Sequence, residues 1–176
     1  MNKDLKKIIL AALYIALGLV LPFVFHAVPS GGTIFLPMHI PVILAGLTIG
    51  VLYSVLVGLL TPILSFFLTN MPTSVVLPGM TLELITYALA CSLLIKVIKT
   101  KYSYLNVYLT LIIAMLLGRA VSGLTNAFIF QAGTYTFKTW VSLSFVTAIP
   151  GIIIQLVLIP NLYVLFKKYL LKDIMK

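Results

Sequence analysis

The chain has 176 residues, of which 62% are hydrophobic and 9% are charged, and its mean hydropathy is +1.21. A soluble domain of this length could not bury so much apolar surface, so the composition excludes a soluble enzyme and predicts an all-α integral membrane protein. The net charge of +9 is explained by membrane topology and anionic lipid headgroups, and it requires no nucleic-acid partner.

Six apolar runs are long enough to cross a bilayer, since a helix needs about 20 apolar residues to span a core of about 30 Å. The runs are continuous and lack the strict alternation of barrel strands, which predicts helices. We therefore expect one compact six-helix domain over residues 1–176. The predicted spans are residues 7–28, 36–51, 52–69, 76–98, 105–131 and 141–167.

The lysines orient this bundle. In a six-span arrangement the connections on one side contain only Lys138 as a basic residue, whereas ten of the twelve basic residues lie on the other side. Because basic residues near span ends stay cytoplasmic, both termini are expected inside and the loops near residues 29–35, 70–75 and 132–140 outside. The ten are Lys3, Lys6, Lys7, Lys96, Lys99, Lys101, Lys167, Lys168, Lys172 and Lys176.

The first span carries two alanines one turn apart, Ala12 and Ala16. Small residues at this spacing allow another helix to approach closely. Residues 3–18 also have the basic start and apolar run of a signal peptide. Five more spans follow and no small-residue cleavage site closes the run, so we expect a retained first helix.

The second span opens with FLPMHIPV, in which His39 lies between Pro37 and Pro41. Proline is tolerated at a helix start, and Pro41 is expected in the first turn or just past it, where it can kink the helix. His39 then has two interpretations. It either hydrogen-bonds the local backbone and holds the bend, or points into a cavity beneath the first outer loop.

The fourth and fifth spans hold the two charges that a bilayer should penalise most. Glu83 lies about two turns into the fourth span, and Arg119 lies near the middle of the fifth. An uncompensated charge at such a depth costs several kcal/mol, so each side chain must be paired, neutralised or exposed to a wet cavity. The two residues either pair and hold two helices together or line an outward-facing ligand cavity.

Helical spacing favours the ligand cavity. Arg119, Gly123 and Asn126 follow at intervals of four and three residues, and Glu83 and Tyr87 are four residues apart, so each set shares a helix face. A polar or small stripe reaching from mid-membrane outward is typical of a cavity wall. Asn126 and Tyr87 could equally form hydrogen bonds between helices.

The outer loops and the sixth span add further candidates. Residues 69–80 are uncharged and proline-containing, which predicts a structured cap, with Asn70 as a candidate ligand contact. Residues 131–140 bring Gln131, Tyr135 and Trp140 to the same side. Trp140 is either an interfacial anchor or a wall of the ligand site. Gln155, in the sixth span, is a weaker candidate for the cavity.

The sequence offers no catalytic chemistry. The two histidines, His26 and His39, have no acid or cysteine at metal-ligand spacing, so no metal site is expected. No GxSxG, HExxH or GxxxxGK[ST] motif is present. We expect a protein that is not an enzyme and holds no cofactor.

Four stretches occur in order along the six predicted spans: Ala12-x-x-x-Ala16, FLPMHIPVILAG, TPILSFFLTNMP and LLGRAVSGL. Over essentially its whole length the chain thereby resembles a substrate-binding S component of an energy-coupling factor (ECF) vitamin transporter. The resemblance implies a multi-pass protein of the prokaryotic cell membrane. It implies high-affinity capture of a vitamin or its precursor on the extracellular side, in a cavity built from helices four to six and the outer loops.

The resemblance also implies partners. Transport would require a membrane coupling subunit and two cytoplasmic ATPases, which alone would use ATP, and Ala12 and Ala16 match the motif for contact with the coupling subunit. As for the ligand, Arg119 suits the carboxylate of pantothenate, whereas Glu83 suits a hydroxyl- or amine-bearing heterocycle such as pyridoxine or hydroxymethylpyrimidine. Neither inference holds if the two residues pair. The rival hypotheses are a self-sufficient facilitator or channel, and a structural membrane protein without a ligand.

Overall fold

The computed structural model describes residues 2–25 and 28–169, and this part of the chain is helical with no β-strand. His26, Lys172 and Lys176 lie outside the described residues. Two of the elements, η1 and η2, are π-helical segments. The elements are α1 (Lys3–Val24), α2 (Gly31–Phe35), α3 (His39–Thr48), α4 (Val51–Thr69), α5 (Leu77–Val97), α6 (Ser103–Thr125), η1 (Asn126–Phe130), α7 (Phe137–Val141), η2 (Ser142–Thr147) and α8 (Ile149–Tyr169).

The six predicted spans are confirmed as helices. Within the described residues, six helical stretches are long and apolar enough to cross a membrane. The first begins at Lys3, earlier than the expected residue 7, because the Asn2 side chain accepts a hydrogen bond from the Asp4 backbone N–H and caps the helix. It ends at Val24, shortly after Pro22.

The second span, expected over residues 36–51, is helical from His39 to Thr48, and a turn separates it from a short helix that precedes it. The short helix α2 ends at Phe35, the chain turns through Leu36 and Pro37, and α3 begins at His39. Leu36 adopts a left-handed conformation with φ of 51°. Pro37 accounts for the end of α2, because proline disfavours the right-handed helical conformation at the residue before it. Pro41 lies in the first turn of α3, where we expected it.

The predicted start of the sixth span at residue 141 is wrong. Residues 137–147 form α7 and η2, and the spanning helix α8 begins only at Ile149. Pro150, at the second position of α8, suits a helix start because its missing N–H would have no partner there. The aromatic segment before it is thereby free to fold over the outer part of α6.

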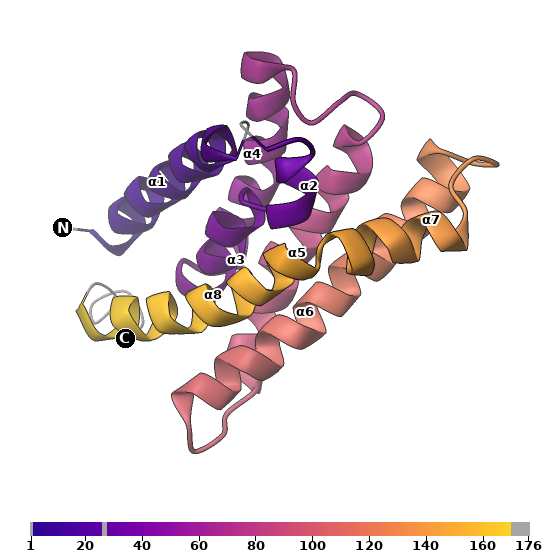
Figure 1. Ribbon diagram of the computed structural model, residues 1–176. Helices are drawn as coiled ribbons and strands as arrows, with labels where there is room; N and C mark the ends of the chain where they lie inside the picture. The colour runs from indigo at the N-terminus through magenta and orange to yellow at the C-terminus, as the bar shows by residue number, and fades with distance from the viewer. Residues whose placement is uncertain (1, 26–27, 170–176) are drawn as a thin grey trace.

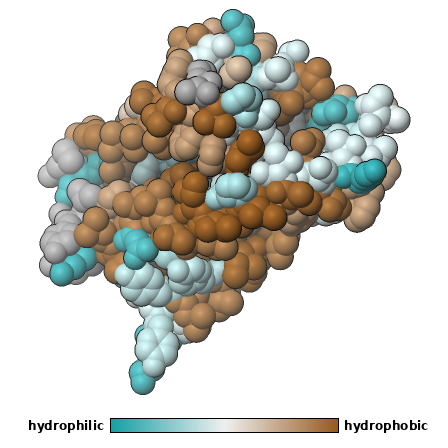
Figure 2. Space-filling view, viewed as in Figure 1, coloured by the Kyte–Doolittle hydropathy of each residue, from teal (hydrophilic) through white to brown (hydrophobic). Residues whose placement is uncertain are grey.

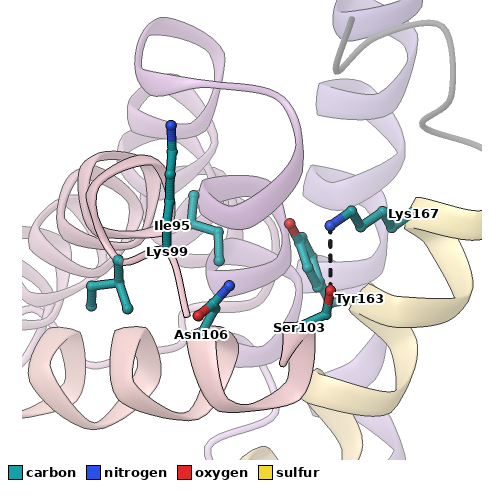
Figure 3. Close-up of a pocket in the computed structure, with 7 residues that line it drawn as sticks. Ile95, Lys99, Ser103, Asn106, Tyr163 and Lys167 are labelled. Carbon is teal, nitrogen blue, oxygen red and sulfur yellow. Dashed lines mark hydrogen bonds between the residues drawn. The ribbon is translucent and has the colours of Figure 1, made fainter. Parts of the chain in front are cut away.

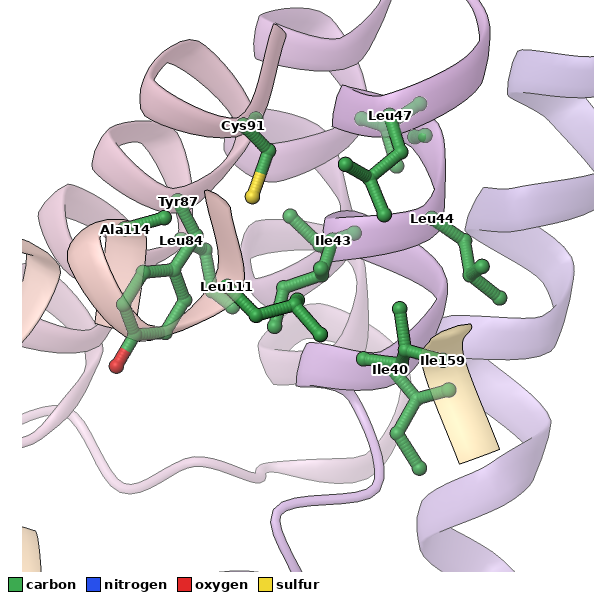
Figure 4. Close-up of a cluster of buried hydrophobic side chains, with 14 of the residues drawn as sticks. Ile40, Ile43, Leu44, Leu47, Leu84, Tyr87, Cys91, Leu111, Ala114 and Ile159 are labelled. Carbon is green, nitrogen blue, oxygen red and sulfur yellow. The ribbon is translucent and has the colours of Figure 1, made fainter. Parts of the chain in front are cut away.

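Helix α3 forms the centre of the bundle. All ten of its residues are buried, and it packs against α1, α4, α5 and α8. Figure 4 shows Ile43 of α3 near Leu84 of α5 and Leu111 of α6, and Ile40 of α3 near Ile159 of α8. Helix α6 lies against α5 and α8, and α1 is a peripheral helix that buries only Tyr14 and Gly18.

The surface agrees with a membrane environment. Large apolar side chains are exposed on α1, α4, α6 and α8, and Figure 2 shows them as a broad hydrophobic region with polar residues toward its margins. The start of α1, the α5–α6 connection and the end of α8 lie toward one side of the molecule, and α7 lies at the other (Figure 1). The lysine-rich segments therefore gather at one end, opposite the helix that contains Lys138.

Glycines allow the central helices to approach closely. A Cβ atom added at Gly46 would lie 2.8 Å from the Ala88 carbonyl oxygen, and one added at Gly58 would lie 2.8 Å from the Leu84 carbonyl oxygen. Both carbonyls belong to α5, so Gly46 and Gly58 allow α5 to pack closely against α3 and α4. Close backbone packing of this kind drives helix association where lipid removes the hydrophobic contribution.

We predict that Gly58→Ala lowers the stability of the folded protein by about 1–3 kcal/mol, because the new methyl group meets a backbone atom that can yield only if the helices move apart. The measurement is thermal unfolding of the purified protein in detergent. Gly32→Ala is the matched control, since a Cβ atom at Gly32 meets nothing within 4 Å. Equal melting temperatures for the two variants would contradict the prediction.

Candidate functional site

Three side chains from α3 and α5 form the centre of the candidate site. The Tyr87 hydroxyl donates a hydrogen bond to Glu83 Oε1 at 2.6 Å, and His39 Nε2 lies 3.9 Å from the same oxygen. The rings of His39 and Tyr87 have centroids 5.6 Å apart. His39 and Tyr87 are buried, whereas the Glu83 side chain remains 17% exposed. One oxygen of the carboxyl group is thus held by protein, and part of the group remains open to a ligand.

His39 does not hold the bend at the start of α3. Its backbone N–H donates to the Leu36 carbonyl at 3.1 Å, but its side-chain Nδ1 is buried and has no hydrogen-bond partner among the described residues. The expectation that the imidazole bonds the local backbone is therefore wrong. Proline geometry at Pro37 makes the turn, and the imidazole faces Glu83 and Tyr87.

Arg119 reaches the same cluster from α6. It is 3% exposed and interacts electrostatically with Glu83 and Tyr87. Its guanidinium lies over the ring of Phe145, 5.3 Å from the centroid, in a cation–π arrangement. The described residues contain no Glu83–Arg119 ion pair within 4.0 Å. The two charges share one site without direct pairing, so each keeps hydrogen-bonding capacity.

Trp140 lies over Arg119. Its indole N–H donates to the Arg119 carbonyl oxygen at 3.0 Å, and its ring lies 5.4 Å from that of Phe145, edge on. Gly123 makes this position available, because a Cβ atom there would lie 2.5 Å from the indole nitrogen. We expected Gly123 to leave open space in a cavity wall. The Trp140 ring fills that space and forms a wall of the cluster.

Asn126 lies at the outer end of α6, where the helix widens into η1. Its amide nitrogen donates to the Ser122 hydroxyl at 3.4 Å, and its oxygen accepts from the Gln131 side chain at 3.4 Å. It packs against Gly79 of α5, where an added Cβ would collide with the amide group. Widened turns of this kind often occur at functional sites. Asn126 therefore joins α5, α6 and the following loop above the charged cluster.

Tyr135 connects the cluster with the connection between η1 and α7. Burial raises the pKa of its phenol above the ordinary value, and the Glu83 carboxyl raises it further, while a hydrogen bond with Ser144 acts in the opposite direction. The Trp140 indole of α7 also bonds the Arg119 carbonyl, which joins α7 to the part of α6 that holds Arg119. The site is therefore nearer to the end of the molecule that holds α7 than to the lysine-rich end.

The remaining candidates are not all brought together. Gln155 of α8 is fully buried and donates to the Leu36 carbonyl at 3.5 Å, while its Oε1 has no partner among the described residues. Asn70 is exposed in a left-handed conformation at the end of α4, and no contact with the cluster is found for it in the described part of the chain. Ala12 and Ala16 are exposed on α1.

Sequence reasoning missed two side chains of the site. Ser122, which interacts with Glu83, lies three residues after Arg119 and four before Asn126, so the helical spacing contained the signal. Phe145 gave no signal, because an aromatic residue inside an apolar run is indistinguishable from core. Tyr135 was placed on the correct side, but its proximity to Glu83 depends on how the connection folds.

Comparison with known proteins identifies the architecture. The family model described as "ECF transporter, substrate-specific component" matches residues 6–163, which include every residue of the candidate site. No curated protein and no solved structure matches the chain. The family match extends from the first span into the last and covers most of the chain. This chain therefore belongs to the family of ECF transporter substrate-specific components, which are multi-pass cell-membrane subunits of transporters.

Proposed function

We propose that this chain is the high-affinity substrate-binding subunit of an ECF-type vitamin importer and that it captures a small water-soluble vitamin or precursor on the extracellular side. The observation that carries the proposal is the cluster of Glu83, Tyr87, Arg119 and His39, in which the carboxylate and the guanidinium lie close without direct pairing. Holding both charges within the membrane region is costly, and apolar residues would serve a purely structural role better.

The cluster offers complementary bonding groups. Arg119 donates to a carboxylate or other acceptor, Glu83 accepts from a hydroxyl or amine, and Tyr87 keeps the carboxyl group oriented through its 2.6 Å hydrogen bond. The unpartnered His39 Nδ1 and Gln155 Oε1 are further polar atoms that the protein itself leaves unsatisfied. A ligand with both donors and acceptors fits this set better than an apolar solute.

Two ligand classes fit these groups about equally well. Pantothenate has a carboxylate for Arg119 and hydroxyls for Glu83. Pyridoxine and hydroxymethylpyrimidine have ring and hydroxyl groups for Glu83, and a flat ring could lie against Trp140, which already covers Arg119. A ring system as large as riboflavin is disfavoured, because the aromatic side chains of the cluster contact one another and Arg119.

The position of the cluster supports outward-facing capture. Burial raises the pKa of Tyr135, and the Glu83 carboxyl raises it further. Tyr135 lies in the loop near residues 132–140, which the positive-inside rule places outside. The lysine-rich segments lie at the opposite end of the molecule (Figure 1). A vitamin would then enter beneath the segment formed by α7 and η2, and Trp140 would form part of the cover.

We predict that a panel of water-soluble vitamins will identify the ligand through thermal unfolding of the detergent-purified protein. Pantothenate, pyridoxine or hydroxymethylpyrimidine is expected to stabilise the fold saturably and without ATP, by about 2.7 kcal/mol at a ligand concentration a hundred times Kd. Riboflavin serves as the large-ring comparison. A folded protein that no vitamin in the panel stabilises would contradict the proposal and favour a structural role.

We predict that Arg119→Ala abolishes ligand binding, because it removes the charged donor of the site. Loss of a hydrogen bond to a charged group costs about 1.5–3 kcal/mol, so the affinity should fall at least tenfold. Isothermal titration of the variant measures this. Lys138→Ala removes a cation from exposed α7 and is expected to bind normally. Unchanged affinity with a lowered melting temperature would show that Arg119 only supports the packing of α5 and α6.

Transport is proposed to require a membrane coupling subunit and two cytoplasmic ATPases, with α1 as the contact helix. Ala12 and Ala16 lie one turn apart on the exposed side of α1, whereas Tyr14 and Gly18 face the bundle. A small-residue face left open to the membrane suits close packing against a partner helix.

We predict that replacing Ala12 and Ala16 with leucine leaves vitamin binding unchanged and impairs uptake at least tenfold, because the bulkier side chains keep the partner helix at a distance. Binding to the purified variant and uptake into proteoliposomes containing the complete transporter measure the two effects. Val157→Phe, which adds bulk to an exposed position on α8, is the control. Uptake by liposomes that contain this chain alone would instead support a self-sufficient facilitator.

A further inference from the structure

A second polar site lies at the lysine-rich end of the molecule, far along α6 from Arg119. A cavity of about 190 Å³ opens where the α5–α6 connection meets the last turns of α8. This volume is several times the roughly 30 Å³ that one water molecule occupies. Figure 3 shows the side chains around it, which are Ile95, Ile98, Lys99, Ser103, Asn106, Tyr163 and Lys167.

The cavity has a positive lining. Lys99 and Lys167 come from two different elements, and no acidic residue is among the seven described residues that line it. The Lys167 ammonium group donates to the Ser103 hydroxyl at 3.5 Å and so leans over the cavity from α8 (Figure 3). Such a long hydrogen bond leaves most of the donor capacity of the ammonium group free for an anion.

Tyr163 supplies a neutral donor at the same place. The residue is 2% exposed, it lines the cavity, and no hydrogen bond of its hydroxyl is found in the described part of the chain. Figure 3 shows Tyr163 among the side chains that line the cavity. Because this hydroxyl faces the cavity and has no partner among the described residues, it is available to donate to an acceptor that enters the cavity.

The first turn of α6 adds a third kind of donor. Ser103 is the first residue of this 23-residue helix, and the side chain of the preceding residue, Tyr102, does not cap it. The first backbone N–H groups of a helix lack partners within it and carry partial positive charge. Lysine, phenol and helix start thus converge on one cavity.

The surroundings point to a lipid as the source of the anion. Ile95 and Ile98 form the apolar part of the lining, and Val97 and Tyr102 expose 76% and 65% of their surfaces beside it. The acyl chains of a phospholipid could cover these apolar side chains. Inorganic phosphate has no apolar part and would leave them uncovered. Basic pockets between membrane helices on the cytoplasmic side commonly hold phospholipid headgroups.

We propose that this cavity binds the phosphate group of an anionic glycerophospholipid from the cytoplasmic leaflet. Lys167 and Tyr163 hold the phosphate oxygens, the start of α6 contributes backbone donors, and Lys99 adds positive charge at the rim. The lipid would hold the α5–α6 connection against α8 at the membrane border. This inference is independent of the vitamin site, since the two sites share no side chain.

The test is a titration of the detergent-purified protein with dioctanoyl phosphatidylglycerol, dioctanoyl phosphatidylcholine or inorganic phosphate, followed by thermal unfolding. Phosphatidylglycerol is expected to raise the melting temperature saturably, at concentrations at least about tenfold lower than either of the other two. Lys167→Gln should raise the half-saturating concentration at least about tenfold, and Tyr163→Phe should raise it severalfold while preserving the ring in the core.

Lys96→Gln is the matched control, because Lys96 is an exposed lysine at the same end of α5 that does not line the cavity. It should change the half-saturating concentration less than twofold. Equal effects of Lys96→Gln and Lys167→Gln would overturn the proposal in favour of diffuse surface charge. Inorganic phosphate acting as strongly as phosphatidylglycerol would overturn the lipid as the source, and absence of any stabilisation by phosphatidylglycerol would overturn the site itself.

Discussion

Polar groups inside a bilayer must find partners within the protein, and this is the central constraint on the molecule. The hydrogen bond from Tyr87 to Glu83 satisfies it for the carboxyl group. The same constraint governs the rest of the bundle. Tyr14 of α1 bonds Thr48 of α3, and the Thr61 hydroxyl bonds a carbonyl of its own helix. Satisfaction is incomplete in the outer cluster, where His39 Nδ1 and Gln155 Oε1 have no partners among the described residues, and the hydroxyls of Ser92 and Thr110 have none elsewhere in the bundle.

The irregular parts of the backbone surround this cluster. The turn at Leu36 and Pro37 sets His39 at the first position of α3, and Gln155 donates to the Leu36 carbonyl, which also accepts from the His39 backbone N–H. On the other side, η1 begins at Asn126, and α7 with η2 brings Trp140 and Phe145 over Arg119. Non-helical or widened backbone at membrane depth is tolerated where it is enclosed by protein, so its concentration here is consistent with a binding function.

The two ends of the bundle present different chemistry. The cluster near α7 combines a carboxyl group, a guanidinium and aromatic rings, which together suit a small polar solute. The cavity beside Lys167 combines cations, the Tyr163 hydroxyl and apolar residues, with no acid among the described residues that line it, which suits an amphipathic anion. Helix α6 reaches both, with Ser103 at one site and Arg119 at the other.

The sequence by itself determined the membrane class, the six spans and the two charges worth examining. Bilayer thickness sets the length of each apolar run, and the cost of burying charge makes Glu83 and Arg119 stand out. Helical spacing also placed Glu83 with Tyr87 and Arg119 with Asn126, because such relations are local. The resemblance carried by FLPMHIPVILAG and LLGRAVSGL indicated the family that the match over residues 6–163 shows.

Only the tertiary structure decided how these residues meet. Each of the relations that matter involves residues from two different helices. Glu83 and Arg119 do not form an ion pair within 4.0 Å, the His39 imidazole faces Glu83, and the Trp140 indole bonds the Arg119 carbonyl. The lengths of the apolar runs did not give the turn before α3 or the late start of α8, because both helix starts depend on backbone conformation and packing. Contacts between distant segments depend on side-chain shape and on how loops fold back, and neither is encoded in local hydropathy.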